Sequence, residues 1–231
     1  MNKNATARTS IIIPAYNEET RIQNMLISYI DYFDCEIIVV CDGQDGSAEI
    51  VKNLSKKYPK IKLLKFISKL GKGGAIIEGF KKSSGDYVGF VDADEAVSPE
   101  QFEILLNELE NSDCAIGSRR IYGSEILRRQ PLKREISSRI FNALSNGLFN
   151  LKIKDTQCGA KVFRRKVIEN VLPKLKSTGF EFDVELLWRI KKESFSIKEV
   201  PIIWRHIDKS SFSLKYAPAM FVGLIKRRIG I

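Results

Sequence analysis

The sequence predicts an α/β protein in which a mostly parallel sheet is flanked by helices. In the first half of the chain, short β-rich runs alternate with amphipathic stretches of helical periodicity. This alternation is typical of parallel sheets with helices on both faces. Several of the β-rich runs, such as Ser10–Ile13 and Glu36–Val40, are apolar almost throughout, as expected for strands that are covered on both sides.

The elements of the first half can be placed from these patterns. The expected strands are Ser10–Ile13, Glu36–Val40, Ile61–Lys65, Tyr87–Val91 and Cys114–Ile116. The helices expected between them are Glu18–Ile30, Ala48–Tyr58, Gly74–Ser83 and Pro99–Glu110. Leu26, Ile30 and Phe33 are spaced as one face of a helix. Pro99 directly follows Ser98, which is a helix start signal.

The character of the chain changes after Gly117. The segment Ser118–Arg139 is rich in arginine and runs into a helical pattern over Ile136–Phe149. The remaining expected elements are a strand over Ala160–Phe163, a helix over Phe180–Lys192 and a strand over Ile197–Trp204. Pro201 interrupts the last strand, which indicates a sheet edge or a bend.

The composition is that of an ordered, basic protein. Of the 231 residues, 44% are hydrophobic and 29% are charged, and the formal net charge is +10. Such an excess fits nucleic acid, an anionic membrane surface or phosphorylated substrates as partners, or a basic surface without a dedicated partner. No linker-like segment divides the chain. We therefore expect one domain over residues 1–213 and a basic amphipathic tail over 214–231.

The cysteines and the start of the chain bear on the compartment. Cys35, Cys41, Cys114 and Cys158 form no CxxC pair, and His206 is the one histidine, so a zinc site is not expected. The N-terminus is polar, and no run reaches the roughly 18 to 20 apolar residues that span a bilayer. Reduced cysteines in a cytoplasmic protein that does not cross a membrane by itself are the expectation.

Polar residues follow four of the expected strands at the point where each strand ends. These segments are Pro14–Glu18, Asp42–Gly43, Asp92–Asp94 and Gly117–Arg120. The carboxyl ends of parallel strands meet at one edge of a sheet, and ligands bind there in open α/β folds. We therefore expect the four segments to form one site.

Asp92 and Asp94 are candidates for a metal site. They leave a buried strand with one small residue, Ala93, between them, so both carboxylates can reach one cation. Hard oxygen ligands without histidine or cysteine suit Mg²⁺ or Mn²⁺, and such a cation stabilises a diphosphate leaving group. The alternative is an ordinary strand-end turn with a helix cap.

Two further segments offer contacts to a nucleotide. Asp42 is placed for hydrogen bonds to a base or a ribose, although Asp-Gly is also a frequent turn sequence. The glycine-rich run Gly71–Ala75 opens a helix, so its backbone and Lys72 suit a phosphate at a helix N-terminus. It matches neither the dinucleotide-binding nor the Walker pattern, and a simple flexible turn is the alternative.

Together these segments resemble family-2 inverting glycosyltransferases of the GT-A fold, which is Rossmann-like. The motifs that carry the resemblance are Ile11–Glu19, the Asp42 turn, Gly71–Ala75, Gly85-Asp86, Asp92–Asp94, Gly117–Arg119, Asp155–Arg165, Phe182–Leu187 and Glu199–Pro201. They cover nearly all of the chain. The later motifs point to the polyprenyl-phosphate branch and look most like dolichyl-phosphate β-glucosyltransferases, with dolichol-phosphate mannose synthases as close relatives.

The resemblance implies a role for each candidate residue. The donor nucleotide would contact Pro14, Ala15, Tyr16, Glu18, Asp42, Lys72, Gly73, Asp92 and Ala93. The expected metal ligands are Asp92 and Asp94, and the expected catalytic residues are Asp92, Asp94, Arg119 and Arg205. The acceptor phosphate would contact Arg119, Arg134, Ser138 and Arg205, and the acceptor pocket would be lined by Gln157, Asp183 and Glu185. The alternative for each arginine is a solvated surface charge, and for the acidic pair it is packing and helix capping.

These roles divide the expected domain into a nucleotide-sugar half, about 1–117, and an acceptor half, about 118–213. Two departures from the family pattern stand out. The turn Cys41–Ser47 lacks the first carboxylate of the common Asp-Asp-Gly-Ser turn. Ala96 stands where mannose synthases have a metal-binding glutamine, so that position supplies no third ligand. The second departure favours the glucosyltransferase-like branch.

The expected reaction is transfer of a hexose, in the first place glucose from UDP-glucose, to a dolichyl or polyprenyl phosphate, for protein glycosylation or glycan assembly. A lipid monophosphate is already anionic, so positioning and charge stabilisation suffice without a catalytic base. The enzymatic alternatives are GDP-mannose as donor and a saccharide or protein hydroxyl as acceptor, which needs a base.

Two alternatives are not enzymes: a nucleotide-binding module without turnover and a basic nucleic-acid-binding protein. The sequence contains no recognisable nucleic-acid-binding motif, so no nucleic-acid partner is expected. The tail 214–231 combines apolar and basic residues, which favours peripheral attachment to the cytoplasmic face of a membrane. A terminal helix that packs on the domain is the alternative for the tail.

Overall fold

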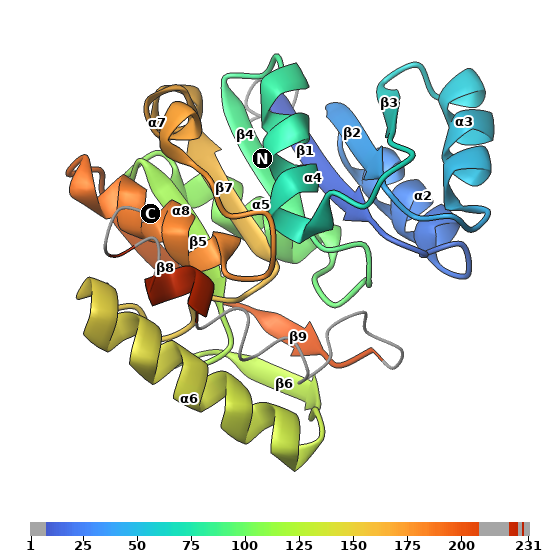
Figure 1. Ribbon diagram of the computed structural model, residues 1–231. Coiled ribbons are helices and arrows are strands. Elements are labelled where there is room, and N and C mark those ends of the chain that lie inside the picture. The colour runs from blue at the N-terminus through green and yellow to red at the C-terminus, as the bar shows by residue number, and fades with distance from the viewer. Residues whose placement is uncertain (1–7, 208–221, 226–227, 229–231) are drawn as a thin grey trace.

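The computed structural model describes residues 8–207, 222–225 and 228, and their centre is a seven-stranded sheet (Figure 1). Its strands, in the order β3-β2-β1-β4-β7-β5-β8 across the sheet, are β3 (Ile61–Lys65), β2 (Glu36–Cys41), β1 (Thr9–Ala15), β4 (Tyr87–Val91), β7 (Ala160–Arg164), β5 (Cys114–Ser118) and β8 (Ile197–Pro201). Only β7 runs antiparallel to its neighbours β4 and β5. The predicted mostly parallel sheet is therefore confirmed.

Helices cover both faces of this sheet. They are α2 (Ile22–Tyr32), α3 (Ser47–Lys57), α4 (Gly71–Lys82), α5 (Pro99–Glu108), α6 (Leu132–Phe149), α7 (Arg165–Val171) and α8 (Phe182–Lys192), with a 3₁₀ turn at Leu172–Lys174. Successive side chains of a strand point to opposite faces. Ile11 and Ile13 accordingly pack with α2, α3 and α5, whereas Ile12 packs with α4, α7 and α8.

The two expected halves of the domain share this one sheet. Strand β7 comes from the second half and lies between β4 and β5 of the first half. The loop before β7, Asp155–Gly159, therefore ends beside the loop that follows β4. This arrangement brings two motifs far apart in the sequence to the same edge.

Some elements begin earlier than expected or were not expected. Helix α4 begins at Gly71 rather than Gly74, and α6 begins at Leu132 rather than Ile136. Strand β6 (Glu125–Arg128) and helix α7 were not predicted. Every residue of β6 is exposed, so it lacks the buried apolar face on which strand prediction depends.

The bend expected at Pro201 is present. Strand β8 ends at this proline on the edge of the main sheet. The chain then continues as β9 (Ile203–Arg205), which pairs in parallel with β6 in a separate two-stranded sheet. Residues 203–205 are thereby carried away from the main sheet and towards α6 (Figure 1).

The remaining expectations concern the cysteines, membrane-spanning helices and the C-terminal tail. Cys35, Cys41, Cys114 and Cys158 are buried and free. Among the described residues, no helix is both long and apolar enough to cross a bilayer. Most of the expected tail 214–231 lies outside the described residues. Within its described part, Leu224 is fully buried in the core that contains α8, and the Arg228 guanidinium donates to the Leu148 carbonyl oxygen (3.0 Å).

Candidate functional site

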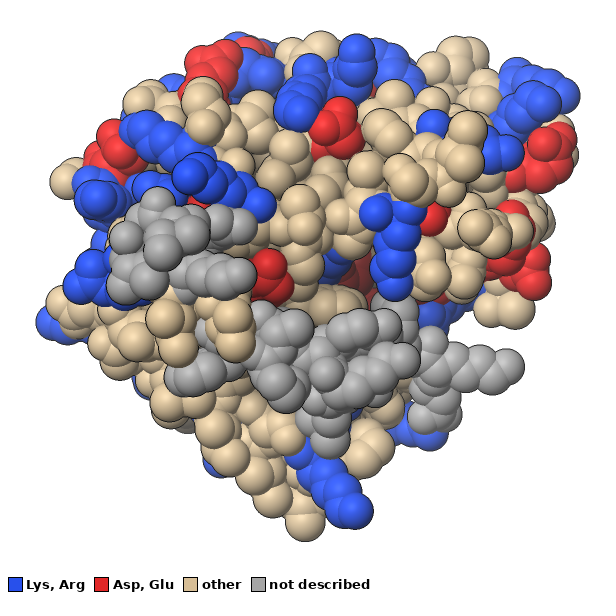
Figure 2. Space-filling model, in the orientation of Figure 1, with Lys and Arg blue, Asp and Glu red and all other residues tan. Residues whose placement is uncertain are grey.

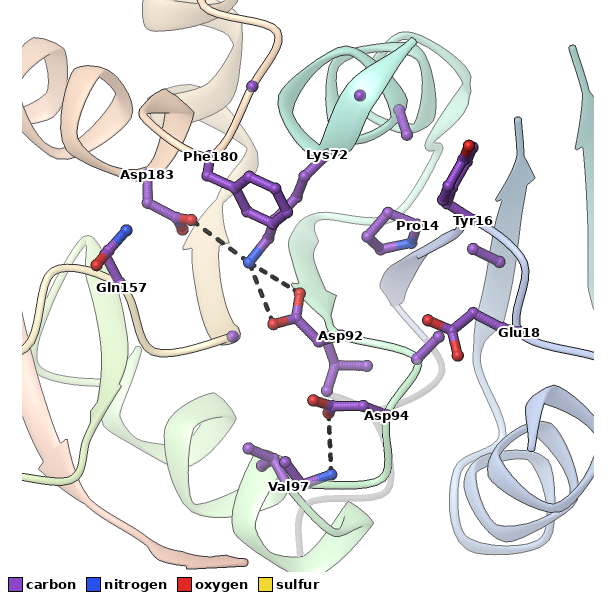
Figure 3. A pocket seen from close by; sticks show the side chains of 18 of the residues that line it. Pro14, Tyr16, Glu18, Lys72, Asp92, Asp94, Val97, Gln157, Phe180 and Asp183 are labelled. Atoms are coloured by element: carbon purple, nitrogen blue, oxygen red, sulfur yellow. Dashed lines mark hydrogen bonds and ion pairs between the residues drawn. The ribbon is translucent and has the colours of Figure 1, made fainter. Parts of the chain in front are cut away.

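A pocket of about 310 Å³ opens at the carboxyl ends of β1, β2, β4 and β5. It is closed from the other side by residues of α6, the start of α8 and the loop before β7. Figure 3 shows the last two, with Asp183 and Gln157 labelled. The predicted residues that line it are Pro14, Ala15, Tyr16, Glu18, Asp42, Lys72, Asp92, Ala93, Asp94, Arg119, Arg134, Ser138, Gln157 and Asp183. The four segments that follow strands thus meet, as their positions predicted.

A chain of alternating charges crosses the floor of this pocket. The Lys72 ammonium contacts the two Asp92 carboxylate oxygens at 2.9 and 3.1 Å and an Asp183 oxygen at 3.4 Å (Figure 3). The other Asp183 oxygen accepts a 2.5 Å hydrogen bond from the Lys161 ammonium. Burial by itself would lower the pKa of Lys72, but the carboxylates of Asp183 and Asp92 outweigh it and raise that pKa. Lys72 is therefore held as a cation.

The surroundings of Asp94 disfavour the charged form of its carboxylate. Burial, and next the negative charge of Asp92, raise the pKa of Asp94 to about 6. Its Oδ1 accepts a 3.1 Å hydrogen bond from the Ala96 N–H. Ala96 thus supports Asp94 through its backbone, and its side chain offers no ligand.

The two carboxylates fit a divalent cation. Two hard oxygen donors that repel one another are stabilised when one cation binds both. Among the described residues, no cluster of three or more His, Cys, Asp and Glu side chains is arranged to hold a metal ion. Asp92 and Asp94 would therefore hold it as a pair, with the remaining positions left to phosphate oxygens and water.

At the end of β2, Asp42 both lines the pocket and anchors a loop. The side chain is buried, and its Oδ2 accepts hydrogen bonds from the N–H groups of Leu70 (2.8 Å) and Gly71 (3.0 Å). These groups lie at the start of α4, where helix N–H donors lack partners within the helix. Asp42 can therefore stabilise the local backbone and still present its side chain to a ligand in the pocket. Gly71 has φ +77°, a conformation that favours glycine.

The segment after β1 forms another wall of the pocket. The Lys69 ammonium lies 3.8 Å from the centre of the Tyr16 ring, so these side chains form one surface of the pocket. Glu18 pairs with Arg21, which also lines the pocket. Burial raises the pKa of Glu18 in spite of that pairing.

The wall of the pocket that follows β5 is basic. The Arg119 guanidinium forms a bidentate ion pair with the buried Asp155 carboxylate (2.7 and 2.8 Å) and lies 5.2 Å from the Trp204 ring centre. Burial by itself would lower the pKa of Arg119, but Asp155 more than offsets it. Ser138 accepts a 2.7 Å hydrogen bond from Arg120. Arg119 is thus rigidly placed at the pocket wall.

Three predicted site residues lie elsewhere, which corrects the sequence interpretation. Gly73 faces α8, where an added Cβ would lie 2.5 Å from Phe182 Cβ, so this glycine serves helix packing. Glu185 is fully buried and accepts hydrogen bonds from the backbone N–H groups of residues 176 and 177. Arg205 is exposed on β9 and is absent from the pocket lining. Alternation along β9 places its neighbour Trp204 there instead.

The sequence interpretation also missed residues that shape the site. Lys161 is fully buried in the middle of β7, and a lysine inside an apolar strand was the available signal, because such a charge needs a partner. Gly159 packs directly on the metal-site candidate: an added Cβ would lie 2.1 Å from Asp92 Oδ2. The Gly159 carbonyl oxygen also accepts the Asp92 N–H at 3.0 Å.

Gly159→Ala is expected to lower turnover by roughly 100-fold, because the methyl group displaces the Asp92 carboxylate and misplacements of about 1 Å have effects of that size. Steady-state kinetics measure the loss. The matched control is Gly147→Ala in α6, where an added Cβ meets nothing within 4 Å. Equal activity of the two variants would show that Asp92 tolerates the displacement.

Comparisons with known proteins agree with one another. Residues 10–172 match the family described as Glycosyl transferase family 2. A dolichyl-phosphate beta-glucosyltransferase of Dictyostelium discoideum is 36% identical over 87% of this chain and 67% of its own. The Saccharomyces cerevisiae enzyme of the same name is 33% identical over 89% and 69%. A polyprenol monophosphomannose synthase of Mycolicibacterium smegmatis is 32% identical over 85% and 77%.

The fold also matches a solved structure. Glucosyl-3-phosphoglycerate synthase from Mycobacterium tuberculosis, crystallised with Mn²⁺ and uridine-diphosphate-glucose, superimposes with a TM-score of 0.71 at 18% identity. The match covers 99% of this chain and 81% of that one. At this identity the likeness concerns the fold, which is of the GT-A type.

Proposed function

Because this chain belongs to glycosyl transferase family 2 and is a glycosyltransferase, we propose that it transfers glucose from UDP-glucose to the phosphate of a dolichyl or other polyprenyl lipid. The observation that supports the proposal best is the division of the pocket. The carboxylates of Asp92 and Asp94 lie at the floor, and Arg119 and Arg134 lie on the wall formed by β5 and α6. The first pair suits a metal-bound diphosphate and the second a phosphate monoester.

On the donor side, the residues after β1 and β2 would bind the nucleotide, and Asp92 and Asp94 would hold Mg²⁺ or Mn²⁺. A divalent cation bound there neutralises the diphosphate and makes it a better leaving group. Lys72 adds a fixed positive charge 2.9 Å from Asp92, close enough to contribute to the same stabilisation. The structural neighbour crystallised with Mn²⁺ and uridine-diphosphate-glucose has the same fold, which supports this assignment.

On the acceptor side of the pocket, no carboxylate among the described residues is left without a cationic partner. A hydroxyl acceptor must lose a proton as it attacks, whereas a phosphate monoester is already anionic. Asp183 faces the pocket, but both of its oxygens are engaged by the ammonium groups of Lys72 and Lys161. Both oxygens are thus already in use as acceptors, and neither is directed at an acceptor hydroxyl. The site therefore suits a phosphate acceptor better than a saccharide or protein hydroxyl.

Two relatives at about one-third identity act, by name, on dolichyl phosphate, and a third is a polyprenol monophosphomannose synthase. We further propose that the enzyme works peripherally at the cytoplasmic face of a membrane; the lipid acceptor supports the membrane, and the free cysteines support the cytoplasmic side. GDP-mannose is the second candidate donor, because the mannose synthase is 32% identical. Ala96 at the position of a third metal ligand favours glucose.

The test is a donor panel of UDP-glucose, GDP-mannose and UDP-N-acetylglucosamine with polyprenyl phosphate in detergent, with Mn²⁺ or Mg²⁺. We expect glucosyl phosphoryl polyprenol from UDP-glucose and loss of the product with EDTA. Polyprenol without the phosphate is the control acceptor and should give no product. A lipid product from GDP-mannose alone would make the protein a mannose synthase, and no lipid product from any donor would reject the lipid-phosphate acceptor.

A further inference from the structure

One face of α6 is apolar and exposed along most of its length. Leu132, Ile136, Ile140 and Leu144 are 70, 48, 56 and 42% exposed. Their spacing of four residues places them on one side of the helix, over about 18 Å at 1.5 Å per residue. Single exposed apolar residues are ordinary, but a continuous stripe marks an interaction surface.

The opposite face of α6 forms the wall of the active-site pocket. Arg134, Ser138 and Phe141 line the pocket from this helix. A helix turns 100° per residue, which puts these side chains roughly opposite the apolar stripe. Helix α6 is therefore a single layer between the pocket and the surface.

The exposed apolar surface continues onto the small sheet beside α6. Ile126 of β6 is 43% exposed and pairs in register with Trp204, so it lies on the face of the small sheet that meets the pocket. In Figure 1, α6, β6 and β9 together form the part of the molecule that projects below the main sheet. We call the stripe on α6 together with Ile126 the lower face.

Basic residues surround the lower face. Exposed basic side chains on α6, β6, β9 and the connection between β6 and α6 are Arg128, Arg129, Lys133, Arg139 and Arg205. The exposed acidic residue in these same segments is Glu125, and Glu135 is paired with Arg139. Tan and blue side chains accordingly predominate at the lower edge of Figure 2. The surface thus combines apolar contact area with positive charge.

An arginine-lined cavity lies between this surface and the active-site pocket. Its lining residues include Arg120, Arg129 and Arg139 together with Ile126 of the lower face. It shares Arg119, Gln130 and Trp204 with the active-site pocket. The cavity also contains Glu135, which is paired with Arg139, so its lining is basic on balance and suits a phosphate.

We propose that the lower face lies on an anionic lipid bilayer and that the lipid phosphate reaches the active site through the arginine-lined cavity between β6 and α6. The inference rests on the proposed lipid acceptor and names the surface that meets the membrane. The apolar stripe would enter the boundary between head groups and acyl chains, and the flanking basic residues would meet the head groups. Charge complementarity and continuity with the pocket select a bilayer as the occupant.

The test is co-sedimentation of the full chain with vesicles of phosphatidylcholine, with or without phosphatidylglycerol. We expect the full chain to bind only the vesicles that contain the anionic lipid. Binding should fall roughly tenfold or more in Ile136→Gln/Ile140→Gln, because this variant buries less apolar surface in the bilayer. Ile67→Gln is the control, since Ile67 is 94% exposed on a loop after β3. Unchanged binding of the double variant, or equal binding to both vesicles, would overturn the proposal.

Kinetics separate this inference from the proposed function. The double variant should keep its activity on a short, water-soluble prenyl phosphate and lose activity on polyprenyl phosphate in vesicles, because the substituted side chains do not line the pocket. Arg129→Gln should raise KM for both acceptors and leave kcat unchanged. Vesicle binding needs no turnover, so it remains measurable if no lipid product forms. Sedimentation equilibrium that shows a dimer lost in the double variant would assign the stripe to a second copy instead.

Discussion

Asp94→Asn is expected to lower turnover by at least about 100-fold, because a divalent cation supplies several kcal/mol of charge stabilisation and each 1.4 kcal/mol is tenfold in rate. The substitution removes one of two carboxylates that would hold the cation. It keeps an oxygen that can accept the Ala96 N–H, which now donates at 3.1 Å. The loss should therefore lie in metal and donor binding, with the fold intact.

Titration calorimetry checks this expectation directly, with UDP and Mn²⁺ as ligands. Without metal, the variant should be as stable as the parent or more stable at pH 7. The reason is the raised pKa of Asp94, about 6. The folded state disfavours the charged carboxylate, so ionised Asp94 lowers the stability of the parent protein as pH rises from about 4 to about 6. Asp31→Asn is the control, with the same chemical change at an exposed position of α2. Full activity of Asp94→Asn would remove the metal role of this residue.

Lys161→Met is expected to produce the largest loss of stability. Lys161 is fully buried, and its ammonium binds the Asp183 carboxylate and the Cys158 carbonyl oxygen (2.6 Å). Removal of one partner from a buried ion pair costs about 3 to 5 kcal/mol. For a chain of this size each kcal/mol lowers Tm by about 2 to 4 °C, so a decrease on the order of 10 °C is expected in thermal unfolding.

Two further variants distinguish the ion pair from simple packing. Lys161→Met/Asp183→Asn should recover much of the lost stability, since no unpaired charge remains buried. Lys198→Met makes the same replacement at an exposed position of β8 and should change Tm little. A double variant no more stable than Lys161→Met would mean that the lost contacts, and not the unpaired carboxylate, set the cost.

Lys161→Met also has consequences for the site. Without the Lys161 ammonium, Asp183 should attract Lys72 more strongly, since the two side chains are 3.4 Å apart in the unsubstituted protein. Lys72 would then move from Asp92, which it contacts at 2.9 Å. The charge chain thus links a residue buried within β7 to the metal-site candidate.

The order of the residues is enough to predict the layered fold and the edge of the sheet at which the site lies. Apolar strands such as Glu36–Cys41 and amphipathic helices are local patterns, because burial on one face or two leaves a period in the sequence. The carboxyl ends of parallel strands meet at one edge. Asp42, Asp92 and Arg119 could therefore be assigned to one pocket before any contact was known.

Which of the other candidates reach that pocket depends on contacts between elements that are distant in the sequence. Gly73, Glu185 and Arg205 lie in or beside motifs of the site, yet helix packing, loop capping and strand alternation direct them elsewhere. β7 runs antiparallel between β4 and β5, and this pairing across the chain brings Gly159 beside Asp92 and Lys161 beside Phe90. Such contacts join residues about 70 positions apart, and no local period records them. The exposed stripe of α6 has the same origin: its helical period is visible in the sequence, but which apolar side chains remain in water depends on what packs against the helix.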